Sequence, residues 1–160
     1  MHDARHLYLF TLEVVPLTVG ATYNPLPSHL TLMSRFWSGY SPEALIDLVK
    51  PLFERTKPIE LLFGQPANIG PKHTAVHLIE HRDEIRHLHN QLCRLLDNIA
   101  VEYTNPQFVG NGHKPHVSRR DGDGFAPGRK QIAKVVYLIE VEIRGDEHLR
   151  FVHAKFDLQA

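Results

Sequence analysis

Two stretches of the sequence share one pattern, and they read Pro27-Ser28-His29-Leu30-Thr31-Leu32 and Lys114-Pro115-His116-Val117-Ser118. Each places a proline shortly before a histidine, which is followed by an apolar residue and then by a hydroxyl residue. Such alternation predicts a β-strand, because successive side chains of a strand point to opposite faces. We therefore expect the imidazole and the hydroxyl of each stretch to share one face, with the apolar residues directed into a core.

An imidazole and a hydroxyl on each of two strands would suit chemistry at a phosphate. An unperturbed histidine titrates near pH 6.5, so a pair can hold one neutral base and one charged acid at neutral pH. Displacement at phosphorus needs a proton removed from the attacking oxygen and another delivered to the leaving oxygen. The spacing alone is a weak signal, because the chain has 12 histidines and ordinary strand histidines are the alternative. Both matches nevertheless follow a proline, begin a strand-like run and lie in opposite halves of the chain.

The composition limits the class of protein. A chain of 160 residues with 42% hydrophobic residues suits one domain, residues 1–160, built as two small lobes that share a core. The 18 basic and 18 acidic residues balance, so no global field attracts nucleic acid or a membrane, and an anion must be bound by a local patch. The single cysteine, Cys93, excludes an internal disulfide and fits a reducing cytosol. No apolar run approaches membrane-spanning length, and we expect a cytoplasmic protein.

Hydrophobic periodicity and turn residues divide the chain into strands and helices. We expect strands over residues 7–15, 29–36, 59–63, 74–80, 116–118, 134–143 and 149–158. Ser41-Pro42-Glu43 is a good helix start, and Pro51 predicts a kink or a stop near the end of that helix. A second and longer helix is expected from Arg82 to Ile99. We expect loops over residues 64–71, 104–112 and 119–128.

Strands in neighbouring pairs and separate helices favour an antiparallel α+β fold over alternating α/β. Each half of the chain has one long amphipathic helix and one strand that carries a histidine motif. We therefore expect a two-lobed, pseudo-duplicated body of antiparallel sheets with outer helices. The bare faces of the two sheets would meet in a central cleft.

With His29-Leu30-Thr31 and His116-Val117-Ser118 on its strands, the chain resembles the two-histidine (2H) phosphoesterase superfamily, the LigT-like or 2′-5′ RNA ligase-like proteins. The resemblance covers nearly the whole chain. It implies metal-independent phosphodiester chemistry on RNA-like ends without a cofactor: opening of 2′,3′-cyclic phosphates, hydrolysis of 2′-5′ linkages, or their reversible joining. The implied partners are RNA termini or small cyclic nucleotides, with no membrane and no obligate protein partner. A non-catalytic RNA- or nucleotide-binding module on the same scaffold is the alternative.

Several other residues are candidates for binding a substrate. Lys114 and Arg119 belong to a group of basic residues around the second motif, which would attract RNA phosphates; a solvated surface is the alternative. Tyr23 is a candidate for stacking on a base, although core packing is the commoner fate of an aromatic residue. The other members of the basic group are His113, Arg120, Arg129, Lys130 and Lys134.

Two further groups of histidines lie on expected elements. His73, His77 and His81 alternate along one expected strand, but residues two apart on a strand are about 7 Å apart, too far to share a zinc ion at bond lengths near 2 Å. We therefore predict no metal site there and expect His77 to line the cleft. His87 and His89 fall on or beside the polar face of the long helix, where we expect them to be solvated.

Overall fold

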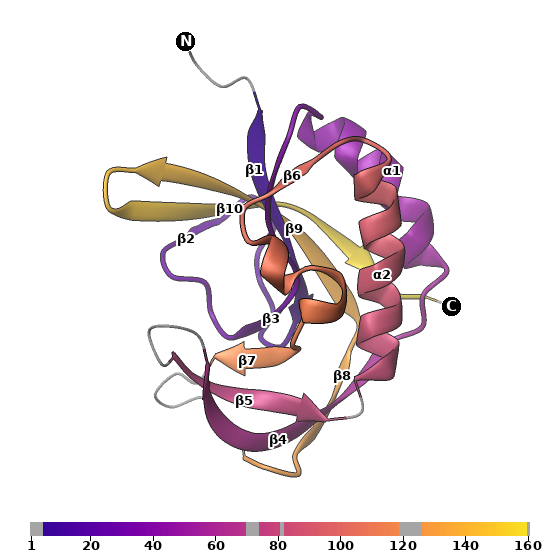
Figure 1. The fold of residues 1–160 in the computed structure, drawn as a ribbon, viewed down its shortest axis with the longest axis vertical. Helices are drawn as coiled ribbons and strands as arrows, with labels where there is room; N and C mark the ends of the chain where they lie inside the picture. Colours follow the sequence, from indigo (N-terminus) through magenta and orange to yellow (C-terminus); the bar gives the residue numbers. More distant parts are fainter. Residues whose placement is uncertain (1–4, 70–73, 81, 119–125, 160) are drawn as a thin grey trace.

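The computed structural model describes residues 5–69, 74–80, 82–118 and 126–159 (Figure 1). Its strands are β1 (His6–Glu13), β2 (Thr22–Tyr23), β3 (His29–Ser38), β4 (Ile59–Ile69), β5 (Thr74–Glu80), β6 (Glu102–Tyr103), β7 (His116–Ser118), β8 (Lys130–Ala133), β9 (Val135–Arg144) and β10 (Glu147–Asp157). Its helices are α1 (Pro42–Glu54) and α2 (Asp83–Asp97), with short 3₁₀ turns η1 (Pro106–Phe108) and η2 (Gly110–Gly112). Among the described residues, neither helix is both long and apolar enough to cross a membrane.

The described strands form one curled sheet of ten strands. Its order is β2-β10-β9-β1-β3-β7-β5-β4-β8, with β6 paired to β3. The pairings between described strands are antiparallel, which confirms the predicted α+β class. The two halves of the sheet are joined where β3 pairs with β7 through Leu30 and Val117. The strands expected to form two separate sheets therefore belong to one continuous sheet.

Both helices bury their apolar stripes against the same face of the sheet. The Ser41 hydroxyl accepts a hydrogen bond of 3.2 Å from the Ala44 amide and Pro42 occupies the first turn, so the predicted helix start is confirmed. The helix continues three residues beyond Pro51 and ends at Glu54, near the end that the sequence predicted. One core combines four apolar residues of α1 and four of α2 with β1 and β3: Leu45, Val49, Leu52, Phe53, Ile85, Leu88, Leu92 and Leu96.

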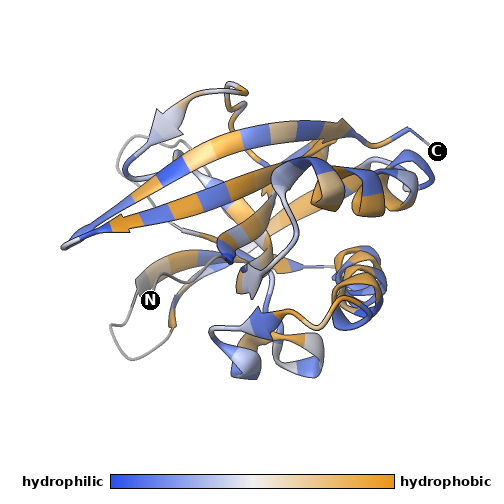
Figure 2. Cartoon of the chain, turned by 90° about the horizontal axis from the view of Figure 1, so that it is seen from above, coloured by the Kyte–Doolittle hydropathy of each residue, from blue (hydrophilic) through white to orange (hydrophobic). Residues whose placement is uncertain are grey.

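A second, smaller core lies on the opposite face of the β1–β9–β10 half. It contains Leu9, Ile139 and Val152, together with Leu17 and Leu26 from the proline-rich connection between β1 and β3. This connection therefore covers part of the face that the helices leave bare. A cleft opens on the same face, and Leu9 and Leu26 also line it. Figure 2 shows the alternation of hydrophobic and hydrophilic residues along the long β9–β10 hairpin, which is typical of strands with unlike faces.

One predicted loop is a strand in the structure. Residues 64–69 of the predicted loop 64–71 continue β4, which pairs with β5 as far as Ile69 and Thr74, and residues 70 and 71 lie outside the described residues. The register of this pairing shifts between Phe63 and Pro66. A bulge of this kind lets a strand accept a proline, which has no amide hydrogen for the ladder.

Candidate functional site

The structure brings the two histidine motifs side by side on β3 and β7. Leu30 and Val117 lie directly opposite each other and are both 0% exposed. Opposite residues of an antiparallel pair point to the same face, and both belong to the core under the helices. The polar residues of the motifs stand one position away, so they point to the other face, and each is partly exposed; they are His29, Thr31, His116 and Ser118.

The register also sets the distance between the two imidazoles. Leu30 and Val117 are paired across β3 and β7. One step along each antiparallel strand therefore sets Thr31 against His116 and His29 against Ser118. The two histidines are then diagonal neighbours, which places their Cβ atoms on the order of 7–8 Å apart. Of the four motif residues, His29 and Thr31 line the cleft beside β3, and its lining residues do not include His116 or Ser118.

Both motif histidines make the same hydrogen bond to the backbone. The Nδ1 atom of His29 donates to the Pro27 carbonyl at 2.9 Å, and Nδ1 of His116 donates to the Lys114 carbonyl at 2.7 Å. Each bond reaches back two residues. A proton held on Nδ1 leaves the lone pair of the neutral ring on Nε2, so the local backbone sets both the tautomer and the ring orientation.

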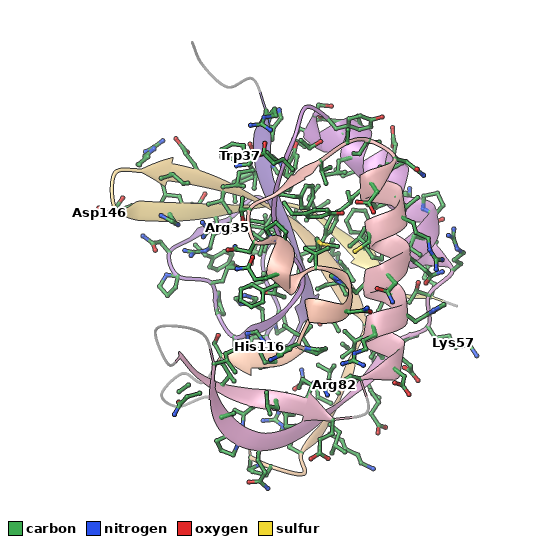
Figure 3. The ribbon with its side chains drawn as sticks, viewed as in Figure 1. Arg35, Trp37, Lys57, Arg82, His116 and Asp146 are labelled. Carbon is green, nitrogen blue, oxygen red and sulfur yellow. The ribbon has the colours of Figure 1, made fainter. Side chains whose placement is uncertain are left out.

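A cleft of about 250 Å³ opens beside the first motif. Its walls come from β1, β3, β10, the proline-rich connection and the segment after β6, and the lining residues are Leu9, Pro25, Leu26, His29, Thr31, Ser34, Arg35, Asn105 and Arg150. These lining residues include two arginines and no carboxylate. Figure 3 places the labelled Arg35 and His116 in the central part of the molecule, between the β9–β10 hairpin and α2.

Two irregularities in β3 direct its side chains into this cleft. The pairing of β1 with β3 shifts register between Phe10 and Thr11 and again between Tyr8 and Phe10. Across the second shift, the three steps from Met33 to Phe36 face only two steps of β1. Ser34 and Arg35 consequently both border the cleft, although strict alternation would separate them. Bulges of this type commonly re-aim side chains beside functional sites.

Two buried histidines, His89 and His113, donate hydrogen bonds to backbone carbonyls of β3 beside the first motif. His113 donates from Nε2 to the Thr31 carbonyl at 3.0 Å, and His89 donates from Nδ1 to the Leu32 carbonyl at 2.7 Å. Their rings are stacked, with centroids 4.1 Å apart. His89 is 0% exposed and His113 5% exposed, so the expectations of a solvated His89 and of a surface His113 are wrong. The backbone of β3 needs donor partners for its carbonyls where β7 ends, and the imidazoles supply them.

This buried pair makes a prediction about stability in acid. Burial, followed by the neighbouring His89, lowers the pKa of His113 to about 4, whereas the unfolded chain takes up this proton near pH 6.5. Stability from the neutral ring is therefore present above pH 6.5 and lost as the pH falls toward 4. Between pH 7 and pH 5 we expect His113 to lower the free energy of unfolding by about 2 kcal/mol.

Urea unfolding at the two pH values measures this loss. The variant His113→Gln keeps a side-chain donor but cannot titrate, and its stability should change less between pH 7 and pH 5 than that of the wild type. His87→Gln, at an exposed position of α2, is the matched control and should keep the wild-type pH dependence. An equal pH dependence in wild type and His113→Gln would contradict the assignment.

The four expected substrate-binding residues have different positions. Lys114 is exposed beside the second motif and offers its carbonyl to His116. His77 lies opposite Val117 and its ring meets Phe63 edge-on at 6.3 Å, so it is buried on the core face, and the expectation that it lines the cleft is wrong. Tyr23 is partly exposed, packs against the second core and accepts a 2.9 Å hydrogen bond from the Thr18 amide, and its stacking on a base stays a prediction. Arg119 lies outside the described residues.

The described part of the chain contains no group of three or more histidine, cysteine or acidic residues arranged to hold a metal ion. Of the three alternating histidines, His77 is placed in the core, and His73 and His81 lie outside the described residues. The residues that the sequence interpretation missed are Ser34, Arg35, Asn105 and Arg150. Two consecutive apolar residues, Leu32 and Met33, break the alternation of polar and apolar residues along β3. This break could have predicted the first bulge.

An antiparallel α+β sheet that carries two histidine motifs side by side is the arrangement expected of LigT-like, two-histidine phosphoesterases. The family model for the 2′-5′ RNA ligase superfamily matches residues 16–154, and the chain belongs to this superfamily. Membership supports phosphodiester processing in general. A comparison with curated protein sequences gives no match.

Solved structures of similar fold include two bacterial proteins. TT0787 of Thermus thermophilus is 17% identical with a TM-score of 0.61, covering 96% of this chain and 98% of that one. LigT of Escherichia coli complexed with 3′-AMP is 14% identical with a TM-score of 0.66, covering 98% of this chain and 99% of that one. LigT complexed with NADP⁺ is 13% identical with a TM-score of 0.63, covering 99% and 100%. At these identities the likeness concerns the fold.

Proposed function

We propose that the protein hydrolyses 2′,3′-cyclic phosphodiesters at RNA ends or in small cyclic nucleotides, with His29 and His116 as its general acid–base pair. The observation that carries the proposal is the repeated arrangement of the two motifs. Each imidazole is oriented by the same hydrogen bond to the carbonyl two residues before it, and both rings leave the same face of neighbouring strands. Escherichia coli LigT, of similar fold, has been solved with 3′-AMP, and a phosphomonoester of this kind would be a product of such a reaction.

The reaction would follow an in-line course at phosphorus. The neutral imidazole removes a proton from water through Nε2 as the water oxygen bonds to phosphorus. The bond from phosphorus to one ribose oxygen breaks, and the protonated imidazole delivers its proton to that leaving oxygen. The product is a ribose 2′- or 3′-phosphate, and which histidine is the base depends on the direction in which the substrate lies. The hydroxyls of Thr31 and Ser118 would donate to the non-bridging oxygens, where negative charge gathers in the transition state.

Hydrolysis of 2′-5′ linkages uses the same two proton transfers with water as the nucleophile. In their reversible joining, a ribose hydroxyl attacks the cyclic phosphate in place of water, and one ring bond from phosphorus to oxygen breaks. The sequence and the family are compatible with both. We favour the cyclic phosphate because the cleft of 250 Å³ beside His29 suits the end of an RNA chain better than its interior. A binding module without turnover remains the second candidate, since the same hydrogen-bond donors would hold a phosphate without reacting.

Turnover of adenosine 2′,3′-cyclic phosphate in the presence of EDTA tests the proposal. We expect the same rate with and without the chelator, because the two imidazoles supply both proton transfers. Product analysis by chromatography distinguishes the 2′- from the 3′-phosphate. Loss of turnover in EDTA, with recovery on adding zinc or manganese, would contradict metal-independent catalysis. Tight binding without any turnover would favour the binding module.

A further inference from the structure

We propose that Arg35 and Arg150 form a second anion subsite in the cleft, which takes a phosphate group of the substrate other than the reacting one. This inference rests on the proposed function, and it predicts a preference for substrates that carry a second phosphate. Examples are a cyclic nucleotide with a 5′-phosphate and an oligonucleotide with a cyclic end. The two arginines line the same 250 Å³ cleft as His29 and Thr31.

The two guanidinium groups converge from strands that are not neighbours. Arg35 belongs to β3 and Arg150 to β10, with β1 and β9 between them in the sheet. His148 links the two arginines: its ring Nδ1 accepts a hydrogen bond of 2.9 Å from Arg35, and its carbonyl accepts one of 2.7 Å from Arg150. The guanidinium groups are therefore held over the intervening strands before any ligand arrives.

The surroundings of these groups favour an anion. Arg35 is only partly exposed, and its burial, followed by the charge of Arg150, lowers the pKa of its guanidinium. No residue lining the cleft is acidic, and the described part of the chain records no ion pair for Arg35. Two like charges brought close together in this way repel each other, and a bound anion would relieve the repulsion.

Other lining groups suit a phosphate more specifically. The Ser34 hydroxyl is buried and has no hydrogen-bond partner among the described residues. The Asn105 amide also borders the cleft. A planar guanidinium donates two parallel hydrogen bonds to phosphate oxygens, and the hydroxyl and the amide can add single donors.

The position along β3 separates this subsite from the reacting phosphate. Four residues lead from Thr31 to Arg35, which is about 13 Å of regular strand at ~3.3 Å per residue, shortened by the bulge. An arginine side chain covers part of this distance. The separation therefore suits a neighbouring phosphate group rather than another oxygen of the same phosphate. The apolar wall of Leu9, Pro25 and Leu26 would contact the ribose or base between the two phosphates.

Steady-state kinetics with three substrates test the subsite. They are adenosine 2′,3′-cyclic phosphate, its 5′-phosphorylated form and the dinucleotide ApA with a 2′,3′-cyclic phosphate. For the wild type, we expect kcat/KM to be at least tenfold higher for one of the two substrates with a second phosphate. Arg35→Gln and Arg150→Gln should each reduce that preference about tenfold or more. The preferred substrate shows whether the subsite binds a terminal 5′-phosphate or an internucleotide phosphate.

Two further variants make the kinetic result specific. Arg35→Lys keeps the charge but not the planar fork, and it should recover only part of the preference. Arg144→Gln removes an arginine at the exposed end of the β9–β10 hairpin, where it pairs with Glu142 at 2.8 Å, and it should leave the preference at its wild-type value. Circular dichroism confirms that each variant folds. An unchanged preference in folded Arg35→Gln and Arg150→Gln would overturn the inference.

A binding measurement separates failure of the subsite from failure of the proposed function. Calorimetric titration with adenosine 3′,5′-bisphosphate and with 3′-AMP requires no turnover. We expect the bisphosphate to bind at least tenfold more tightly to the wild type, and this difference to shrink in Arg35→Gln and Arg150→Gln. If no cyclic substrate reacts but this difference is found, the subsite stands and the proposed catalysis fails. Equal affinities for the two compounds in the wild type would overturn the subsite.

Discussion

Replacement of His29 or His116 by alanine is expected to lower kcat/KM for a 2′,3′-cyclic nucleotide by about 10²- to 10⁴-fold, the usual contribution of a general acid or base. Each ring would transfer one of the two protons that the displacement requires. Both side chains point away from the core that contains Leu30 and Val117, so the fold should survive either replacement. Circular dichroism and a thermal melt of each variant test that expectation.

The pH dependence of the wild type provides a second result from the same enzyme. Turnover needs one imidazole neutral and one protonated, so the profile of kcat/KM against pH should be bell-shaped, and its two limbs report on the pair rather than on either residue. His87→Ala is the matched control, because His87 is an exposed histidine of α2. We expect its rate to equal that of the wild type. Folded His29→Ala or His116→Ala that retains nearly full activity would place catalysis elsewhere.

Replacement of Thr31 or Ser118 by alanine should have the next largest effect, on the order of 10²-fold in kcat, because one donor to the developing charge is lost. The Thr31 carbonyl, which accepts from His113, is untouched by this change, so the backbone should stay in place. Thr18→Ala, at an exposed position of the β1–β3 connection, is the control and should keep the wild-type rate.

The division between kcat and KM identifies the role of the hydroxyls. A donor that acts mainly on the transition state lowers kcat and kcat/KM together, whereas one that holds the ground state raises KM. Initial rates at saturating and at low substrate measure both quantities. A change confined to KM in both alanine variants would assign the hydroxyls to substrate binding alone.

The sequence predicted the faces of the two motif strands because local alternation determines them. The parity of His29 with Thr31 needs only an extended backbone, and the buried Leu30 between them shows that the alternation holds there. The helix that begins at Ser41 was equally predictable, because its cap and its first-turn proline are local signals. The register that sets Leu30 against Val117 was not predicted, because it depends on the pairing of strands that lie far apart in the chain.

Residues beyond the motifs were harder to predict because their positions depend on tertiary pairing. Arg35 reaches the cleft through a bulge in β3, whose exact place depends on β1. His77 obeys the expected alternation, but the core lies on the opposite face from the one predicted, since its partner on β7 is Val117. The apolar stripe of α2 predicted a solvated position for His89. The residue is buried instead, and its ring bonds to the Leu32 carbonyl and the Gly110 amide.

The central claim is that His29 and His116 act together on one phosphate, and the double variant His29→Ala/His116→Ala tests it most directly. The measurement is kcat/KM on adenosine 2′,3′-cyclic phosphate for the wild type, both single variants and the double variant. Groups that act as a unit are strongly non-additive, so we predict that the double variant is hardly slower than the poorer single one. A loss equal to the product of the two single losses would show that the histidines act independently, and it would contradict the account.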